Sequence, residues 1–270
     1  MSKINVNTWE PESSTALTMG ATGDTTTVPS GASLVVASGA TINITGATQT
    51  GFPTGGLLGL VVYTGDGTYT IGGTSNGTAG DEGNASVTKC IIECQAAGGG
   101  AADYAGTAFA YAGGNGGGGA YSKTFRSLTD ITTITVVVPS GGARGGSGVA
   151  GGAASLTKAS GSGTFATITC NGGSGGGAAA GTNYGSGGAG AAAPTTGDIN
   201  IGGGSGRRGT GALDIVAGGS FMGIQSYMPT TDTVTGPASV GYGSGGMGGM
   251  GAESVGAAGG DALILIWEYA

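Results

Sequence analysis

The residue types that carry out most enzyme chemistry are sparse or absent in this chain. There is no histidine, which removes the commonest general base and the commonest metal ligand. The carboxylates stand far apart in sequence, so a pair able to hydrolyse a glycosidic bond would have to be assembled by the fold. They include Asp103, Asp130, Asp198, Asp214, Asp232, Glu253 and Asp261. We expect solvated surface charges and no enzyme activity; an acid pair assembled by the fold is the alternative.

The three cysteines do not have the spacing of a metal site. Cys90, Cys94 and Cys170 are odd in number and contain no Cys-x-x-Cys, so neither a disulfide framework nor a zinc site is supported. If residues 87–94 form a strand, Cys90, Ile92 and Cys94 share one face. We expect buried thiols that pack beside Ile92 as small apolar groups, and no bound metal.

One glycine motif contains a basic pair. Gly204–Gly209 satisfies the Gly-x-Gly-x-x-Gly spacing of dinucleotide sites, but such a site opens a helix and no helix is expected here. We attribute the match to the abundance of glycine and expect no cofactor. Arg207 and Arg208 are expected in a turn between glycine tracts, where guanidinium groups can bind anionic sugars or lipopolysaccharide phosphate. A turn that only aids solubility is the alternative.

Two stretches interrupt the glycine tracts with large side chains. We expect both to protrude as loops, because bulky rings do not fit a close glycine packing, and to contact a receptor. The alternative is that these rings cover the edge of the glycine domain or a subunit interface. The candidate residues are Tyr104, Phe109 and Tyr111 within 102–111, and Phe221, Met222, Tyr227 and Met228 within 220–238.

Composition excludes several classes of protein. The chain has 66 glycines in 270 residues, 9% charged residues, 38% hydrophobic residues and a net charge of −7. Disordered chains combine high charge with low hydrophobicity, which this chain does not. Collagen needs glycine at every third position with abundant proline, and this chain has neither. Eight basic residues in an acidic chain argue against nucleic acid as a partner. No apolar run approaches the roughly 20 residues that span a bilayer, and the polar start is not a signal peptide, so we expect cytoplasmic synthesis and no membrane insertion.

Three zones differ along the chain. Residues 1–50 contain an eight-residue repeat, ATGDTTTV, PSGASLVV and ASGATINI at 21–44. Each block is too short for a helical pair and suits a strand with a glycine turn. Such a ribbon cannot bury its apolar side alone, so we expect a stem in which other subunits supply the core, as in a homotrimer. A flexible linker is the alternative. Residues 51–95 are expected to be a strand connector, and residues 96–270 a glycine-rich domain.

The expected fold is all-β or irregular, with almost no α-helix. Between the strands lie tracts such as GGSGGGAAAG and GYGSGGMGGMG. Ordering glycine is entropically unfavourable, and we expect dense backbone pairing between extended polyglycine II helices to offset it, capped by the strands. The strands are expected at 60–70, as a hairpin or tight connection around Gly65–Gly67, and at 87–94, 120–128, 132–138, 165–171 and 262–269.

The order of these segments resembles a known family. The runs LVVYTGDGTYTI, VTKCIIECQAAGGG, GGGGAYSKTFRSL, ITTITVVVPSGG, FATITCNGG and GGDALILIWEYA resemble the glycine-rich domain that ends many phage tail-fibre and tail-tip proteins, over about residues 57–270. The chain is also similar to the distal adhesins of T-even-like long tail fibres, in which polyglycine helices form a slab and the connecting loops touch bacteria. It departs from those adhesins in carrying its own stem.

The resemblance implies a virion structural protein at an exposed end of a phage appendage. Its N-terminal segment would join other tail or virion proteins. Its loops would recognise a bacterial surface polysaccharide or outer-membrane protein during adsorption. Capsid decoration or a head fibre is the alternative within the virion. A remote alternative is an ice-binding glycine-rich protein, for which the threonines of the repeat are too irregularly spaced.

Overall fold

The computed structural model divides the chain into two compact units, residues 1–52 and 53–270. It describes most of the second unit and none of the first, so the expected stem at 1–50 lies outside the described residues. The described ranges are 56–72, 87–104, 112–179, 184–209, 215–223, 227–228, 235–236, 238–239, 241–249 and 254–270. Within them there are strands and extended segments but no helix, which confirms the all-β expectation for this part of the chain.

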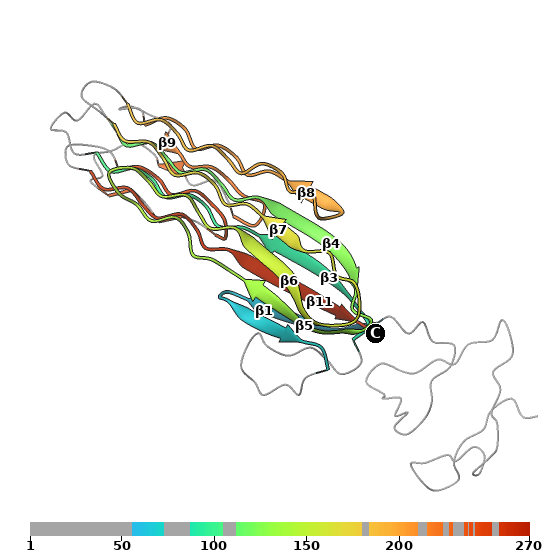
Figure 1. Ribbon diagram of the computed structural model, residues 1–270. Helices are drawn as coiled ribbons and strands as arrows, with labels where there is room; N and C mark the ends of the chain where they lie inside the picture. The colour runs from blue at the N-terminus through green and yellow to red at the C-terminus, as the bar shows by residue number, and fades with distance from the viewer. Residues whose placement is uncertain are drawn as a thin grey trace, which may run out of the picture. The chain divides into compact units, whose positions relative to one another are not determined.

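Five strands form an antiparallel sheet in the order β1-β11-β3-β4-β8 (Figure 1). The strand closest to the C-terminus lies between β1 and β3, and the short β8 forms the far edge. Apolar residues dominate β11 and supply four of the seven residues of β3, as expected for strands that are half-buried or better, whereas β4 is mixed. The strand bounds are β1 Leu57–Tyr63, β3 Lys89–Gln95, β4 Tyr121–Ser127, β8 Ile199–Ile201 and β11 Leu263–Tyr269.

A second antiparallel sheet has the order β2-β5-β6-β7. Its strands are β2 Gly67–Thr70, β5 Ile131–Val137, β6 Ala154–Gly161 and β7 Ile168–Cys170. Because β1 pairs with β11 whereas β2 pairs with β5, the two strands around Gly65–Gly67 do not form a hairpin. The segment is instead a tight connection between the sheets, and the Asp66 carboxylate within it accepts a 2.7 Å hydrogen bond from the Val138 N–H.

The core lies between the two sheets. Ile92, Ile264 and Ile266 of the first sheet and Ile134 and Leu156 of the second are 1% exposed or less. The cysteines contribute as expected: Cys90, Cys94 and Cys170 are free, fully buried and part of this cluster. The Cys170 thiol donates a 3.2 Å hydrogen bond to the Cys94 carbonyl, which ties the two sheets together.

Beyond the core, the strands run on as glycine-rich tracts that lie side by side (Figure 1). In the tract 96–104, which follows β3, the backbone N–H groups point to three partners in rotation. Every third N–H donates to the same neighbour, first to tract 112–120, then to 145–152, then to 254–260, with N···O distances of 2.6–3.3 Å. Carbonyl groups of 96–104 accept from segments 142–145 and 173–176. The backbone of this buried tract is therefore paired in several directions around its axis.

The tract 112–120, which precedes β4, has the same three-residue rotation. Its donors reach segments 171–177, 204–207 and 243–246 in turn, with N···O distances of 2.8–3.2 Å. Every residue from 112 to 120 is buried, although the tract contributes almost no side-chain volume. Stacked sheets normally lie about 10 Å apart because side chains separate them. Here glycine lets the layers meet backbone to backbone.

Glycine is required where these tracts meet. A Cβ on Gly117 would lie 2.0 Å from the Ala189 carbonyl oxygen, and one on Gly118 would lie 2.1 Å from that of Gly219. Both distances are far below any real contact, so a side chain would force the tracts apart. The three-residue rotation and the absence of space for Cβ account for the clustering of glycine in the sequence.

Candidate functional site

The end of the glycine tracts remote from the sheets, here called the distal end, contains a paired cation and ring. Tract 202–209 runs beside the tract that begins at Tyr184, and the Gly209 N–H donates a 2.9 Å hydrogen bond to the Gly185 carbonyl. This pairing brings the Arg208 guanidinium over the Tyr184 ring, with 4.9 Å from guanidinium carbon to ring centroid. The Arg208 residue is exposed and Tyr184 is half-buried. A guanidinium stacked on an aromatic ring remains able to bind a carboxylate or phosphate through its N–H groups.

Arg207 is not in a turn, contrary to the expectation for the arginine pair. Its N–H donates to the Val216 carbonyl at 2.9 Å, and its own carbonyl accepts from the backbone and side-chain amides of Asn115 at 3.2 and 2.8 Å. The pair therefore belongs to an extended tract held by two neighbours, because glycines on both sides let those neighbours approach. Both arginines are nevertheless exposed to solvent.

Tyr104 also departs from expectation. It does not protrude: it is 4% exposed, and its N–H donates a 2.9 Å hydrogen bond to the Ser254 carbonyl. The ring lies beyond Gly98–Gly100, the glycines of this tract at which a Cβ would meet a neighbouring backbone. Phe109 and Tyr111, the other two candidates of this stretch, lie outside the described residues.

The second aromatic stretch is divided between the two ends of one tract. Residues 215–216 (β9) and 227–228 (β10) form a two-stranded pair in which Tyr227 lies opposite Val216. Since Val216 also pairs with Arg207, the β10 backbone belongs to the distal end. The side chains of Tyr227 and Met228 are outside the described residues.

Phe221 and Met222 lie at the other end, next to the five-stranded sheet. The Phe221 ring stacks on the Tyr121 ring, with centroids 4.1 Å apart and planes inclined by 27°, yet the residue stays 57% exposed. The Met222 N–H donates a 3.2 Å hydrogen bond to the side-chain oxygen of Gln95, which is fully buried. These two candidates are thus separated from the arginines and are fixed against the ends of β3 and β4.

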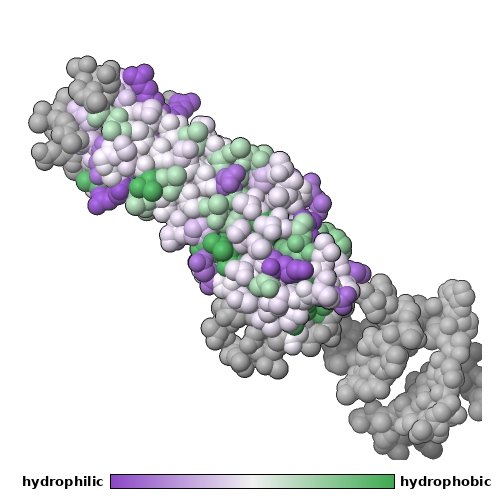
Figure 2. All heavy atoms as spheres, in the orientation of Figure 1, coloured by the Kyte–Doolittle hydropathy of each residue, from purple (hydrophilic) through white to green (hydrophobic). Residues whose placement is uncertain are grey.

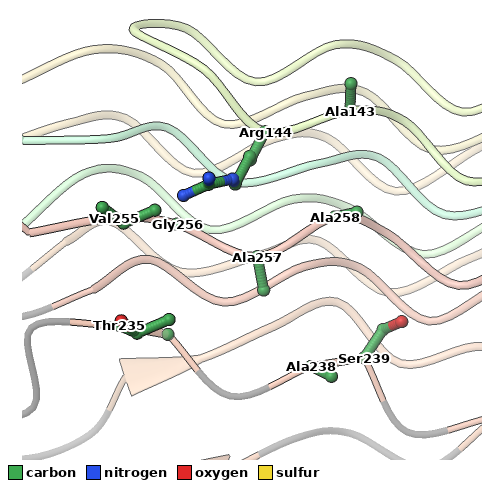
Figure 3. A pocket seen from close by; sticks show the side chains of 10 residues that line it. Ala143, Arg144, Thr235, Ala238, Ser239, Val255, Gly256, Ala257 and Ala258 are labelled. Atoms are coloured by element: carbon green, nitrogen blue, oxygen red, sulfur yellow. The ribbon is translucent and has the colours of Figure 1, made fainter.

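A groove opens along the side of the glycine tracts (Figure 3). Its volume is about 720 Å³, and the segment 255–258 lies between its two walls. Arg144 stands on one wall, and Thr235 and Ser239 stand on the other. Sequence reasoning missed Arg144, whose only signal is that it is a lone exposed cation in a glycine tract. The lining offers one guanidinium and two hydroxyl groups.

The rest of the surface of this unit has few strongly hydrophilic or hydrophobic side chains. Figure 2 shows a mostly pale surface between the sheets and the distal end, with strongly hydrophilic side chains gathered at either end. Among the described residues, no group of three or more acidic, cysteine or histidine side chains is placed to hold a metal ion. The described part of the chain also contains no helix long and apolar enough to cross a membrane.

Comparison with known proteins adds no relative to this picture. No protein-family model matches the chain, and no curated protein sequence matches it.

Proposed function

We propose that the chain is a structural protein of a tailed-phage virion, a tail fibre or fibre tip that presents the distal end to the host surface during adsorption. The observation that carries the proposal is the arrangement of Arg208 over Tyr184 at the end of a backbone-packed scaffold. Such a scaffold is ordered before it meets a ligand, so its exposed side chains bind without a large ordering cost. In this proposal the chain catalyses no reaction and holds no cofactor.

We also propose that the glycine tracts are polyglycine II helices. The support is the rotation of hydrogen-bond partners with a period of three in tracts 96–104 and 112–120. Extended helices with three residues per turn direct their backbone groups outward in this way. Glycine on all sides permits the close approach seen at Gly117. This packing explains how a chain with 66 glycines reaches an ordered interior.

The repeat at 21–44 supports a homotrimer with residues 1–50 as its stem. Joining three copies would bring three distal ends to the same bacterial surface, and multivalent binding would raise the overall affinity without new contacts. The N-terminal segment would attach the trimer to other virion proteins.

The ligand chemistry that fits the Arg208–Tyr184 pair is an anionic saccharide, such as the phosphorylated core of lipopolysaccharide. A fork of N–H donors binds the phosphate or carboxylate, and the ring edge contacts the sugar. Arg207, exposed on the same tract, adds a second positive charge.

Two experiments test this function. Antibodies against the chain, imaged on virions, are expected to label the tail or fibre tip, whereas labelling of the capsid surface would favour the decoration alternative. Virions carrying Arg208→Ala are then expected to adsorb to host cells about tenfold more slowly, the usual scale for loss of a central contact. Lys89→Ala, which also removes one exposed cation but at the start of β3 in the five-stranded sheet, is the matched control. Equal adsorption by the two variants would reject the Arg208 contact.

A further inference from the structure

The outer face of the five-stranded sheet, the face turned away from the core, carries a block of apolar side chains that is bordered on the same face by the exposed pair Lys89 and Ser127. Side chains alternate between the faces of a strand, and the register places Leu60, Trp267, Ile91 and Phe125 side by side across four strands on this face. A neighbouring row contains Val62, Leu265, Glu93, Lys123 and Ile199. We call these two rows the outer face.

Several of these side chains are open to solvent. Phe125 and Ile199 are each 52% exposed, Leu60 is 43% exposed and Val62 is 39% exposed. The other apolar members, Ile91, Leu265 and Trp267, are half-buried by their neighbours. A continuous apolar sheet face of this kind marks an interaction surface, because single scattered apolar residues are normal but contiguous ones are not.

The single carboxylate of the outer face has its donors already. Glu93 accepts hydrogen bonds from Trp267 Nε1 at 3.1 Å, Lys123 Nζ at 3.1 Å and the Tyr121 hydroxyl at 2.8 Å. Its side chain is 13% exposed and forms an ion pair with Lys123. A sugar-binding platform needs open acceptors beside its rings, and here the carboxylate is occupied. The face therefore suits a protein surface better than a saccharide.

The glycine tracts that cover the extension of this sheet stop at its border. Tract 217–220 lies over 116–118, where Gly218 donates to the Gly116 carbonyl at 2.9 Å. The chain then turns at Ser220–Gly223, where Phe221 stacks on Tyr121. Past that ring, Leu60, Phe125 and Ile199 are exposed, so no tract among the described residues covers this part of the sheet.

We propose that the outer face is covered by a second copy of this chain. This inference rests on the homotrimer proposed above and names its contact surface. The chain has a net charge of −7, so two copies meet most favourably where neither surface is negatively charged. In the two rows of the outer face the charged residues are Glu93 and Lys123, which neutralise each other as an ion pair. Strands about 4.8 Å apart with a rise of about 3.3 Å per residue give these two rows roughly 300 Å² in projection. The face is therefore part of the roughly 800 Å² that each partner of a stable interface buries, and contacts along the proposed stem would supply the remainder.

The place of β1 supports the same partner. This edge strand begins at Leu57, soon after the proposed stem at residues 1–50. Copies joined through the stem would hold their β1 strands at high effective concentration, which favours contact between weakly apolar surfaces. Contact there would also cover the edge of β1 that pairs with no other strand of the described residues, a feature that proteins normally protect.

Thiol labelling in the full chain tests the proposal. The three native cysteines are buried and should not react, so Phe125→Cys provides a single probe on the outer face. Val149→Cys is the matched control, since Val149 is 54% exposed against 52% for Phe125 and lies in a glycine tract. We expect maleimide to label Phe125→Cys at least about tenfold more slowly, because access limits thiol reactivity. Adding Leu60→Lys to Phe125→Cys should restore fast labelling.

A second readout avoids altering the face. In a Trp9→Phe variant, Trp267 is the sole indole, and acrylamide should quench it weakly in the assembled protein and strongly after Leu60→Lys. Light scattering on the same samples reports the mass. A multi-copy protein in which both thiols react equally and Trp267 is quenched freely would overturn this interface while the trimer stands. A monomer would overturn the interface even if the chain still binds cells, and protection seen only within virions would assign the face to another virion protein.

Discussion

The Tyr69 hydroxyl donates a 2.7 Å hydrogen bond to Glu268 Oε1, joining β2 of one sheet to β11 of the other. Tyr69 is fully buried and Glu268 is 3% exposed, so the bond lies within the core. Burial, and then this bond, raise the pKa of Tyr69 far above its ordinary value. The two sheets are thus connected by a polar contact as well as by apolar packing, and the contact should contribute to the free energy of unfolding.

Tyr69→Phe keeps the ring and removes the hydroxyl, leaving a buried carboxylate short of a donor. We expect the free energy of unfolding to fall by about 1–3 kcal/mol, the usual penalty for such a loss. Chemical denaturation of the full chain measures it. Replacing Glu268 as well, in Tyr69→Phe with Glu268→Gln, should recover part of the loss because no charge remains buried. An additive double variant would mean that the two groups act separately.

Alkaline pH should weaken the fold. Burial raises the pKa of Cys90 to about 12 from an ordinary value of 9.0, and burial together with the bond to Glu268 raises that of Tyr69 from 10.0. The folded state therefore favours the neutral forms. The contribution of Cys90 to stability is complete below about pH 9 and that of Tyr69 below about pH 10. Each is lost as the unfolded chain deprotonates above that pH, at about 1.4 kcal/mol per pH unit for each group. Denaturation midpoints between about pH 8 and pH 11 check this slope. Tyr69→Phe should show a shallower fall, and an identical slope would contradict the assignment.

The sequence predicts the most apolar strands correctly because each is a short continuous run of apolar and β-branched residues. The run at 132–138 appears as β5 Ile131–Val137 and the closing segment as β11 Leu263–Tyr269. β6, Ala154–Gly161, has no such signal: small and polar residues fill its sequence, and it becomes a strand because β5 and β7 pair with it on both sides. The hairpin reading of Gly65–Gly67 failed because a local turn signal does not say which sheet each strand joins.

The partners of the glycine tracts are beyond local sequence reasoning. Glycine predicts that backbone groups pair, but Gly98 and Gly99 are the same residue type and still donate to different tracts, Gly260 and Gly117. Which tracts become neighbours is set by the order of the strands in the two sheets, because the tracts continue from the ends of those strands. The same reason explains the candidate site: nothing local indicates that Tyr184 meets Arg208, or that Tyr104 is buried while Phe221 is exposed.

Single glycine substitutions should separate structural glycines from permissive ones. Gly117→Ala would drive a Cβ to 2.0 Å from the Ala189 carbonyl oxygen. Since the neighbour is backbone, the tracts must move, and we expect a loss above about 4 kcal/mol or failure to fold. The matched control is Gly146→Ala, where a Cβ meets nothing within 4 Å. There we expect a change within about 0.5 kcal/mol of zero. Thermal melts of both variants decide, and equal melting temperatures would contradict the close-packed arrangement.

Hydrogen exchange provides the last test, because it reads the backbone directly. Each N–H from Gly114 to Ala120 donates to a carbonyl of another tract, and the whole segment is buried although Asn115 is its sole side chain larger than a methyl group. We therefore expect these seven amides to exchange as slowly as those in the centre of β3, with opening free energies near that of global unfolding. An exposed polyglycine segment of equal length would exchange without protection. Fast exchange at residues 114–120 beside slow exchange in β3 would mean that the sheets fold without the tracts, and a uniform slow rate across both would mean that strands and glycine tracts open as one cooperative unit.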